Sequence, residues 1–560
     1  MEIGSRPGFC LQQILCGSWS SADRKFSLAL NVKMSVEECE SDSSENIFAK
    51  KRPRVDVFLS SEEEEENVGE WHDPRGNQPN IVPFTHPFGF VSENLHIRSD
   101  IAIETCYELF VPGKLFEEIA EQTNLHASQQ LKGGCTQRLV KWTVTNKSEI
   151  KRFFGLILWM GLVKLPAIYL YWSHDPVYMQ TFPQKIMSRN RFELLLRMLH
   201  FADDRNSNGS NRLFKIQPVI DTLEMNFKKY YNPTKDMCID ESLIPFRGRI
   251  IFRQYLKQKR HKYGVKIFKL CCESGYTYAL RVYTGKALEK ENTTPTKIVM
   301  SLCRDLFDKG HTLYTGNWYT SLELAEKLIN KNIHLVGTLR SNRQGNPQQV
   351  ISKKLKRGEI IAKENKQGIT ILKWKDKRDI LVLSTKHSSE MVNVESRSEH
   401  KLKPQIIVDY NRGKAAVYLS DQMNAYNNPL CKSMKWYRKL AFELLLNTTV
   451  LNSYILYKDI TKKNISITEF REKLAVHLTN CREEDIPSGS IATTSKKRHK
   501  HQKQPGKVSA VRKYCKLCYE KNAKQSGRAM ARKMTKQVVT FCDTCEGQPF
   551  LCLPCFNKIH

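Results

Sequence analysis

Long apolar runs are scarce in this chain of 560 residues. The longest, residues 153–163, has 11 residues and is followed by Lys164 and Pro166, so it is too short to cross a bilayer and is typical of a buried helix. The first residues also lack the basic segment and apolar run of a secretory signal peptide. These absences predict a soluble protein with no membrane partner.

Acidic side chains are in short supply over most of the chain. There are 89 Lys and Arg against 58 Asp and Glu, a formal net charge of +31. Residues 1–110 carry a net charge of −9, residues 111–560 therefore carry +40, and residues 496–560 alone carry +13. Such an excess attracts polyanions and makes their binding depend on salt. Because solubility does not require so large a charge, nucleic acid is the expected partner.

A disulfide pattern is also missing. Eleven of the 17 cysteines are scattered, which favours a reducing compartment. The other six form three Cys-x-x-Cys pairs, followed by His560: Cys515 with Cys518, Cys542 with Cys545, and Cys552 with Cys555. Two thiolates at this spacing can bind one tetrahedral zinc ion, so a structural zinc module is predicted. Two complete sites need eight ligands. The C-terminal carboxylate or a nearby histidine could be the eighth, and one incomplete site is the alternative.

The composition divides the chain into regions. Residues 1–84 contain acidic runs and few apolar residues, which predicts disorder, and residues 1–33 could be an upstream extension. Short basic runs at residues 50–54 and 496–500 are candidate nuclear-import signals, and the second could equally be a linker that touches phosphates. We therefore expect the protein in the nucleus.

The hydrophobic pattern predicts mixed secondary structure. Apolar residues recur at helical spacing in residues 150–160 and 191–201, and residues 436–457 have the pattern of one long amphipathic helix. Several segments have the β-branched and aromatic content of strands: residues 237–246, 265–271, 276–283, 312–315, 369–374 and 380–384.

Three motifs in order resemble the acidic motifs of the piggyBac transposase family. They are residues 238–242 (Cys-Ile-Asp-Glu-Ser), 316–321 (Gly-Asn-Trp-Tyr-Thr-Ser) and 416–423 (Ala-Val-Tyr-Leu-Ser-Asp-Gln-Met). A basic stretch at residues 259–266, the helix after Trp436 and the terminal cysteine-rich module also occur in the order of that family. The resemblance covers residues 85–560, and the chain is similar to a domesticated, piggyBac-derived host protein.

The resemblance implies an α+β multidomain fold with an RNase H-like mixed sheet as its core. A helical dimerisation and DNA-binding domain, an inserted subdomain and a C-terminal zinc-binding domain complete it, and a homodimer is a further implication. The implied layout is a helical domain (85–234 and 428–483), a core (235–344 and 405–427), an insertion (345–404), a basic linker (484–511) and a zinc domain (512–560). In the family, the zinc domain is cross-braced and holds two zinc ions, so that the first and third pairs would share a metal.

In that family three aspartates bind the divalent metal ions that cleave DNA. Two ions about 3.5–4 Å apart need several converging carboxylates beside a polyanionic substrate. This sequence keeps Asp240 at the first position, but Gly316 and Tyr418 stand at the other two, and only the neighbouring Asp421 remains. Glycine offers no ligand, and a neutral tyrosine is a poor one for Mg²⁺. We therefore predict a pseudo-transposase with vestigial Asp240 and Asp421, in which Mg²⁺ would matter only if the enzyme were active.

Basic residues surround the first cysteine pair and the segment that follows it. The candidate contacts to DNA phosphates are Arg512, Lys513, Lys516, Arg528, Arg532 and Lys533. Double-stranded DNA is therefore the expected partner. Two other functions stay open: an active cut-and-paste DNA transposase, and a chromatin adaptor whose zinc module binds protein. The carboxylate count distinguishes the first, and the salt dependence of DNA affinity distinguishes the second.

Overall fold

The structure is a computed structural model that describes residues 70–91, 100–132, 139–206, 211–257, 261–285, 294–396, 399–429, 435–480, 500–543, 545 and 547–559. Within these ranges, no helix has both the length and the apolar character needed to cross a membrane. The basic run at residues 50–54 and most of the run at 496–500 lie outside the described residues.

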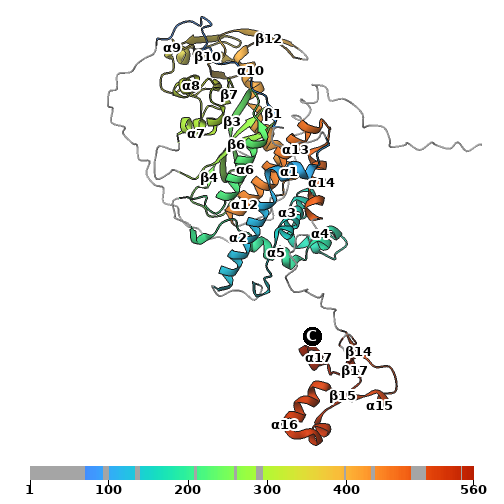
Figure 1. The fold of residues 1–560 in the computed structure, drawn as a ribbon. Coiled ribbons are helices and arrows are strands. Elements are labelled where there is room, and N and C mark those ends of the chain that lie inside the picture. The colour runs from blue at the N-terminus through green and yellow to red at the C-terminus, as the bar shows by residue number, and fades with distance from the viewer. Residues whose placement is uncertain are drawn as a thin grey trace, which may run out of the picture. The chain divides into compact units, whose positions relative to one another are not determined.

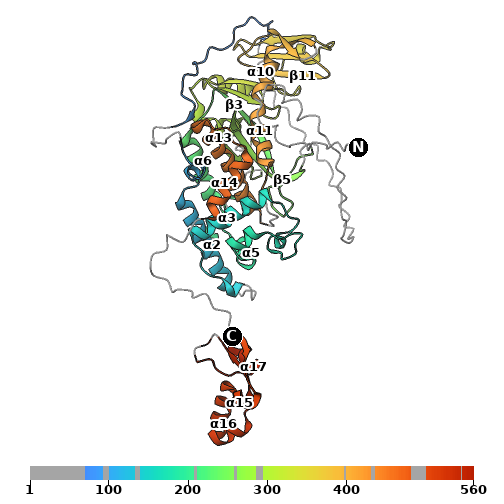
Figure 2. The same ribbon diagram turned by 90° about the vertical axis from the view of Figure 1, so that its right-hand side faces the viewer.

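Two groups of helices that are far apart in the sequence pack against each other, with α14 on α3 and α13 on α1 (Figures 1 and 2). The first group is α1 (Ile103–Phe110), α2 (Gly113–Lys132), α3 (Lys147–Leu162), α4 (Thr181–Ile186), α5 (Arg189–Met198) and α6 (Gln217–Tyr230). The second group is α12 (Trp436–Glu443), the π-helical turn η7 (Leu444–Thr448), α13 (Thr449–Thr461) and α14 (Ile467–Thr479). The helices expected at residues 150–160 and 191–201 are confirmed as α3 and α5.

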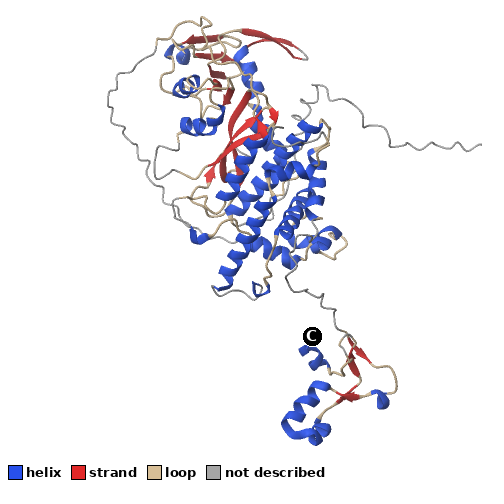
Figure 3. Ribbon diagram, viewed as in Figure 1, coloured by secondary structure: helices blue, strands red, loops and turns tan. Residues whose placement is uncertain are grey.

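A nine-stranded sheet has the order β4-β5-β3-β7-β8-β11-β10-β9, and β6 also pairs with β5. Figure 3 shows the strands in red and the helices in blue. Its strands are β3 (Asp236–Pro245), β4 (Gln254–Tyr255), β5 (Tyr263–Cys272), β6 (Thr277–Val282), β7 (Thr312–Thr315), β8 (His334–Thr338), β9 (Ile360–Glu364), β10 (Thr370–Lys375) and β11 (Asp379–Ser384). β3 is antiparallel to β5 and parallel to β7, and β7 is parallel to β8. The predicted strands are confirmed as β3, β5, β6, β7, β10 and β11.

Short elements connect the sheet to the helices. They are β1 (Gly89–Phe90), β2 (Tyr231–Asn232), α7 (Pro295–Leu302), α8 (Leu322–Ile329), α9 (Gln348–Ser352), the hairpin β12 (Met391–Ser396) and β13 (Glu399–Pro404), α10 (Gln405–Gly413) and α11 (Ala415–Ala425). Of these, α11 packs on β3 and β5 and so covers one face of the sheet.

Residues 345–404, the expected insertion, contain β9, β10, β11 and the hairpin of β12 and β13. Val382, Leu383 and Ser384 of β11 continue the antiparallel ladder of β8, and β10 and β9 follow outward. These strands therefore extend the core sheet. Only the hairpin of β12 and β13 forms a two-stranded sheet of its own.

The segment just before the helices also differs from expectation, because residues 70–84 were assigned to a disordered acidic region. Glu364 of β9 is fully buried, and its carboxylate accepts hydrogen bonds from the backbone N–H groups of Arg75, Gly76 and Asn77 at 3.2–3.3 Å. His72 pairs with Glu364 through the backbone. The composition of residues 1–84 predicted disorder because it is an average that includes the acidic runs. It carries no information on a hydrogen bond to one carboxylate far along the chain.

The long helix predicted at residues 436–457 is present as α12, η7 and α13, but it is not amphipathic. Almost every side chain from Tyr437 to Tyr457 is buried, because this helix passes between the sheet and the other helices. Its polar residues bond inside the protein: Asn452 donates to the Thr277 carbonyl and accepts from the Thr277 N–H, both at 2.9 Å. Satisfied in this way, polar side chains are tolerated in a buried helix.

Candidate functional site

One face of β3 carries Cys238, Asp240 and Ser242, because alternate residues of a strand point to the same side. This face lies against α11. Cys238 Sγ donates to the Lys414 carbonyl at 3.4 Å, and Ser242 Oγ donates to Asp421 Oδ1 at 2.6 Å. Asp240 therefore lies between these two contacts, on the side of the sheet that α11 covers.

Gly316 lies next to Asp240 in the strand register. The last residue of β7, Thr315, pairs with Ile239, so Gly316 follows directly beside Asp240. A Cβ atom built on Gly316 would meet no atom within 4 Å, so the position has room for a larger side chain. Tyr418, on α11, is 71% exposed and is therefore not enclosed between the helix and the sheet.

Lys269 is the buried cation of this site. It lies directly opposite Asp240 in the ladder of β3 and β5, is 1% exposed, and places Nζ 3.1 Å from Asp421 Oδ1. Burial alone lowers the pKa of Lys269, but the carboxylates of Asp421 and Glu443 outweigh burial and raise the pKa above its ordinary value. A charged ammonium group therefore lies between β5 and α11 at neutral pH, and it neutralises Asp421.

Sequence reasoning missed Lys269, although a signal was present. Every residue from Gly264 to Cys272 is buried, so β5 is a central strand in which a lysine must have an acidic partner. The identity of that partner, 152 residues further along the chain, could not be read from spacing.

The opposite face of β3 is filled by aromatic side chains. Glu241 accepts a hydrogen bond from Tyr319 Oη at 2.9 Å and lies 3.6 Å from Lys266 Nζ. Lys266 in turn lies 4.6 Å from the ring centres of Trp318 and Phe268, a favourable cation–π arrangement. Burial raises the pKa of Tyr319, so its hydroxyl stays a hydrogen-bond donor. These contacts hold the loop after Gly316 against the sheet.

Residues 500–559 form a small cysteine-rich module. Its elements are β14 (His501–Lys503), α15 (Val508–Val511), β15 (Lys513–Tyr514), α16 (Lys516–Met534), β16 (Gln537–Val538), β17 (Thr540–Cys542) and α17 (Leu553–Ile559). β14 pairs with β17, and β15 pairs with β16. Among the described residues of the module, the buried members of its apolar cluster are Cys515, Cys542 and Leu551, so a metal ion would add the stability that so small a core lacks.

The module brings four cysteines together at the starts of α16 and α17. The Sγ atoms of Cys515, Cys518, Cys552 and Cys555 all lie within 4.8 Å of one another, and three of their separations are 3.4, 3.6 and 3.8 Å. Bonds of about 2.3 Å at tetrahedral angles would separate the sulfur atoms of a zinc site by about 3.8 Å. The donor set therefore fits a structural zinc ion shared by the first and third pairs.

The second pair stands apart from this cluster. Cys542 ends β17, directly opposite His501 of β14, and Cys545 follows in the next turn. Within the described residues, neither cysteine joins a group of three or more candidate ligands. His560, the seventh expected ligand, lies outside the described residues.

The six basic residues expected to contact DNA are all exposed on this module: Arg512, Lys513, Lys516, Arg528, Arg532 and Lys533. The last three lie on α16, which bends at Gly527 because that residue adopts φ of 77°. Lys513 Nζ lies 5.1 Å from the ring centre of Phe550. The bend separates Arg528, Arg532 and Lys533 from the turn that carries Cys518.

A second group of metal-type ligands, His126, His200 and Asp204, has a geometry that argues against metal binding. The two imidazole rings are stacked, with centres 4.1 Å apart and planes 4° apart, so their in-plane lone pairs run side by side and do not converge. His200 Nε2 already pairs with Asp204 Oδ1 at 2.9 Å, and Lys215 Nζ binds the same oxygen at 2.8 Å. Burial, followed by the charge of His200, lowers the pKa of His126 to about 4. Burial also lowers the pKa of His200, so at pH 7 the two stacked imidazoles are neutral, while Asp204 is an anion paired with Lys215.

Comparison with known proteins identifies a transposase family. Residues 104–454 match the family model described as Transposase IS4. The chain is 26% identical over 390 residues to PiggyBac transposable element-derived protein 3 of Homo sapiens, covering 66% of this chain and 63% of that protein. It is 24% identical over 402 residues to PiggyBac transposable element-derived protein 5 of Homo sapiens, covering 66% of this chain and 74% of that protein.

A solved structure has the same fold. The cryo-EM structure of a piggyBac transposase synaptic complex with hairpin DNA matches with a TM-score of 0.62 at 24% identity, over 77% of this chain and 96% of that chain.

Removing Asp421 should destabilise the protein, because Lys269 would be left charged and buried. We expect Asp421→Ala to lower the free energy of unfolding by about 2–3 kcal/mol, below the ~3–5 kcal/mol of a fully buried pair because Asp421 keeps some contact with water. The double variant Lys269→Met with Asp421→Leu should lie within about 1 kcal/mol of the wild type. Urea unfolding measures both, with Lys473→Ala in an exposed ion pair as the control. Equal losses in the single and double variants would contradict the pairing.

Zinc should be bound through the four clustered cysteines. Elemental analysis of the purified chain is expected to find zinc, and Cys552→Ser should lower the content by about one ion per chain because a structural site needs four ligands. Hydrogen exchange should then increase within residues 500–559. Cys303→Ser, which removes a buried cysteine of the core, is the matched control. Unchanged zinc in the Cys552→Ser protein would show that the cluster is not a metal site.

Proposed function

Because this chain belongs to the piggyBac-type Transposase IS4 family, we propose that it is a transposase-derived nuclear protein that binds double-stranded DNA without cutting it. It matches 63% of the length of the first relative named above, so the activity of the whole relative is not carried over. Three parts of the proposal have separate support: the core fold, the altered acidic site and the basic cysteine-rich module.

The core is proposed to be RNase H-like. Support comes from the strand order β6-β5-β3-β7-β8, in which β6, β5 and β3 are antiparallel neighbours and β3, β7 and β8 are parallel neighbours. The packing of α14 on α3 supports one helical domain made from the two separate segments 85–234 and 428–483. In this arrangement the metal-binding positions would lie where β3, β7 and α11 meet.

The observation that carries the loss of cleavage is the ammonium group of Lys269. Cleavage by two metal ions needs converging carboxylates to balance roughly +4 of charge. At the corresponding place this chain offers Asp240, whereas Gly316 and Tyr418 supply no carboxylate and Asp421 is already paired with Lys269 at 3.1 Å. A divalent ion would also lie close to the buried ammonium, which repels it. The ammonium group of Lys269 thus supplies positive charge where a divalent metal ion would supply it in a DNA-cleaving site.

DNA binding is proposed for the cysteine-rich module. Arg528, Arg532 and Lys533 are exposed on the part of α16 that follows the bend at Gly527. Cations grouped on one short helical segment are well suited to phosphate contacts, which fix register but read no sequence. The net charge of +13 on residues 496–560 adds a field that favours any duplex.

We expect no strand cleavage by the purified chain. A labelled duplex carrying a candidate terminal repeat should remain intact with Mg²⁺ or Mn²⁺, and Asp240→Ala should change nothing. The double variant Gly316→Asp, Tyr418→Asp, which restores the two acids, should bind Mn²⁺ weakly. Adding Lys269→Met to this variant should raise its affinity for Mn²⁺ at least about tenfold, because a buried positive charge beside the metal site is removed. Calorimetric titration measures the metal affinity. Metal-dependent nicking that disappears in Asp240→Ala would overturn the inactive assignment.

Duplex affinity should fall steeply with salt. The triple variant Arg528→Gln, Arg532→Gln, Lys533→Gln is expected to bind more weakly and to flatten the slope of log affinity against log salt by up to about 0.9 per lost phosphate contact. Fluorescence anisotropy across a salt series measures both quantities. The control removes three exposed cations elsewhere, by Lys354→Gln, Lys356→Gln and Arg357→Gln. A flat salt response of the wild type would instead favour an adaptor whose zinc module binds protein.

A further inference from the structure

We propose that a basic groove on the folded core binds single-stranded DNA, with unpaired bases stacked on exposed tyrosines. Three adjoining cavities of about 710, 720 and 580 Å³ make up the groove. The first and second share Pro245 and His261 in their lining, and the second and third share Glu193. Neighbouring cavities therefore share part of their walls, and the combined volume of the three exceeds that of a single small-molecule site of about 300–1,000 Å³.

Cations dominate the lining of the groove. Nine Lys and Arg side chains line the three cavities, against Glu193 as the acidic lining residue. Arg189 pairs with Glu193 at 2.7 Å, and Arg191 pairs with Glu149, which lies outside the lining. Among the described residues, none that lines the cavity of about 710 Å³ is acidic. A row of positive charges of this kind matches the regularly spaced phosphates of a nucleic-acid strand.

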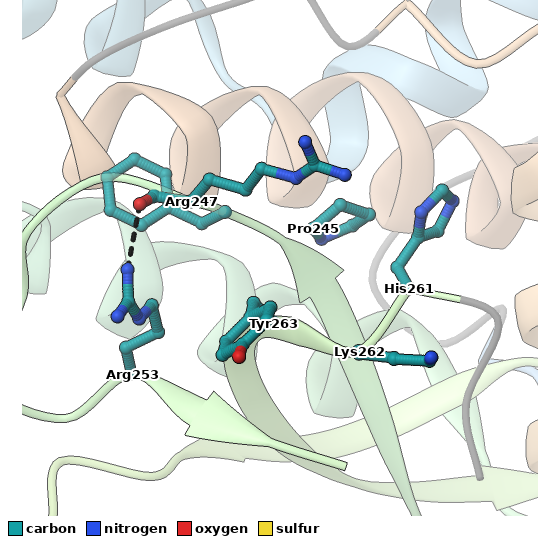
Figure 4. A pocket seen from close by; sticks show the side chains of 7 residues that line it. Pro245, Arg247, Arg253, His261, Lys262 and Tyr263 are labelled. Atoms are coloured by element: carbon teal, nitrogen blue, oxygen red, sulfur yellow. Dashed lines mark hydrogen bonds between the residues drawn. The ribbon is translucent and has the colours of Figure 1, made fainter. Parts of the chain in front are cut away.

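In two of the cavities an exposed tyrosine lies beside an arginine. In the first cavity, Tyr263 is 45% exposed, and its ring lies 5.3 Å from the guanidinium carbon of Arg253 and 4.9 Å from the ring of Tyr255. Figure 4 shows Tyr263 between the side chains of Arg253 and Lys262, with Arg247 and Pro245 across the cavity. In the second cavity, Tyr169 is 54% exposed, with the guanidinium carbon of Arg189 5.6 Å from its ring centre.

The arginine beside Tyr263 is held in place. Arg253 Nη1 donates to the Arg247 carbonyl at 2.8 Å and to the Gly248 carbonyl at 3.2 Å. A guanidinium group has five N–H donors in a fixed plane, so these two bonds orient it and still leave donors for a phosphate. Arg253 and Tyr263 thus form a prepared pair, in which one side chain suits a phosphate and the other suits a base.

The exposed tyrosines distinguish an unpaired strand from a duplex. In a duplex the base faces are stacked on one another, so a tyrosine in the protein groove finds no exposed base face to stack on. In a single strand each base can stack on an aromatic ring, with a contribution to binding that does not depend on sequence. The choice of DNA over RNA rests on the function proposed above, whereas the choice of an unpaired strand rests on Tyr263, Tyr255 and Tyr169.

The test uses the full chain and a 15-nucleotide oligo(dT) labelled with fluorescein. Tyr263→Leu should weaken binding by about fivefold or more, because one stacked base is lost, and Tyr263→Trp should keep it. Arg253→Gln should weaken binding and flatten the salt dependence. Phe88→Leu removes an exposed aromatic ring outside the three cavities and serves as the control, as does Lys354→Gln for charge. Melting temperatures show whether each variant is folded.

A second readout locates the strand directly. Oligonucleotides containing 5-bromodeoxyuridine should crosslink to peptides that contain Tyr255, Tyr263 or Tyr169. Crosslinks confined to residues 500–559, or unchanged affinity of a folded Tyr263→Leu protein, would overturn the groove. Equal losses for a duplex of the same length would overturn the choice of a single strand, and tighter binding of oligo(U) would overturn the choice of DNA. If the triple variant of Arg528, Arg532 and Lys533 loses duplex binding but still binds oligo(dT), the proposal for the groove is supported. If that variant binds the duplex as the wild type does, only the proposal that the cysteine-rich module binds duplex DNA is contradicted.

Discussion

A buried ammonium group needs carboxylate partners, and this need organises the centre of the protein. Lys269 of β5 reaches Asp421 of α11 and lies in the field of Glu443 on α12. Leaving an ion unpaired in a protein interior costs several kcal/mol, so the pair holds α11 over β3 and β5 whatever chemistry the site performs. Ser242 strengthens the same contact from the neighbouring strand.

Glu443 also connects this centre to a second buried cation. Asn447 donates to Glu443 Oε2 at 2.9 Å, and Arg471 of α14 donates to Asn447 Oδ1 at 3.3 Å and to the Leu446 carbonyl at 3.0 Å. The π-helical turn η7 makes the Leu446 carbonyl available, because widening the helix shifts its backbone hydrogen bonds. Burial lowers the pKa of Arg471 to about 10, so it remains charged at neutral pH. The polar residues of this buried helix thus join the helical domain to the sheet.

On the proposed function, the scaffold of a DNA-cleaving enzyme is retained with a different cation at its centre. The space beside Gly316 stays open, and the aromatic loop after it is still anchored to Glu241 by Tyr319. The positive charge of Lys269 stays inside the protein, paired with Asp421, whereas the exposed cations on α16 and in the groove beside Tyr263 would serve binding. The family-level similarity alone could not separate these roles, because fold does not specify the chemistry of a site.

The sequence by itself determined what depends on neighbouring residues. The strand at residues 312–315 and the helices around residues 150–160 and 191–201 follow from short-range patterns, and so does the prediction that each cysteine pair can bind one metal ion. The tertiary structure alone decided which distant groups meet: Lys269 with Asp421, Arg471 with the π turn, residues 70–84 with Glu364, and Cys515 with Cys552. The spacing of neighbouring residues predicts local secondary structure, because it reflects backbone preference. The partner of a buried charge depends instead on how elements that lie far apart in the chain pack together.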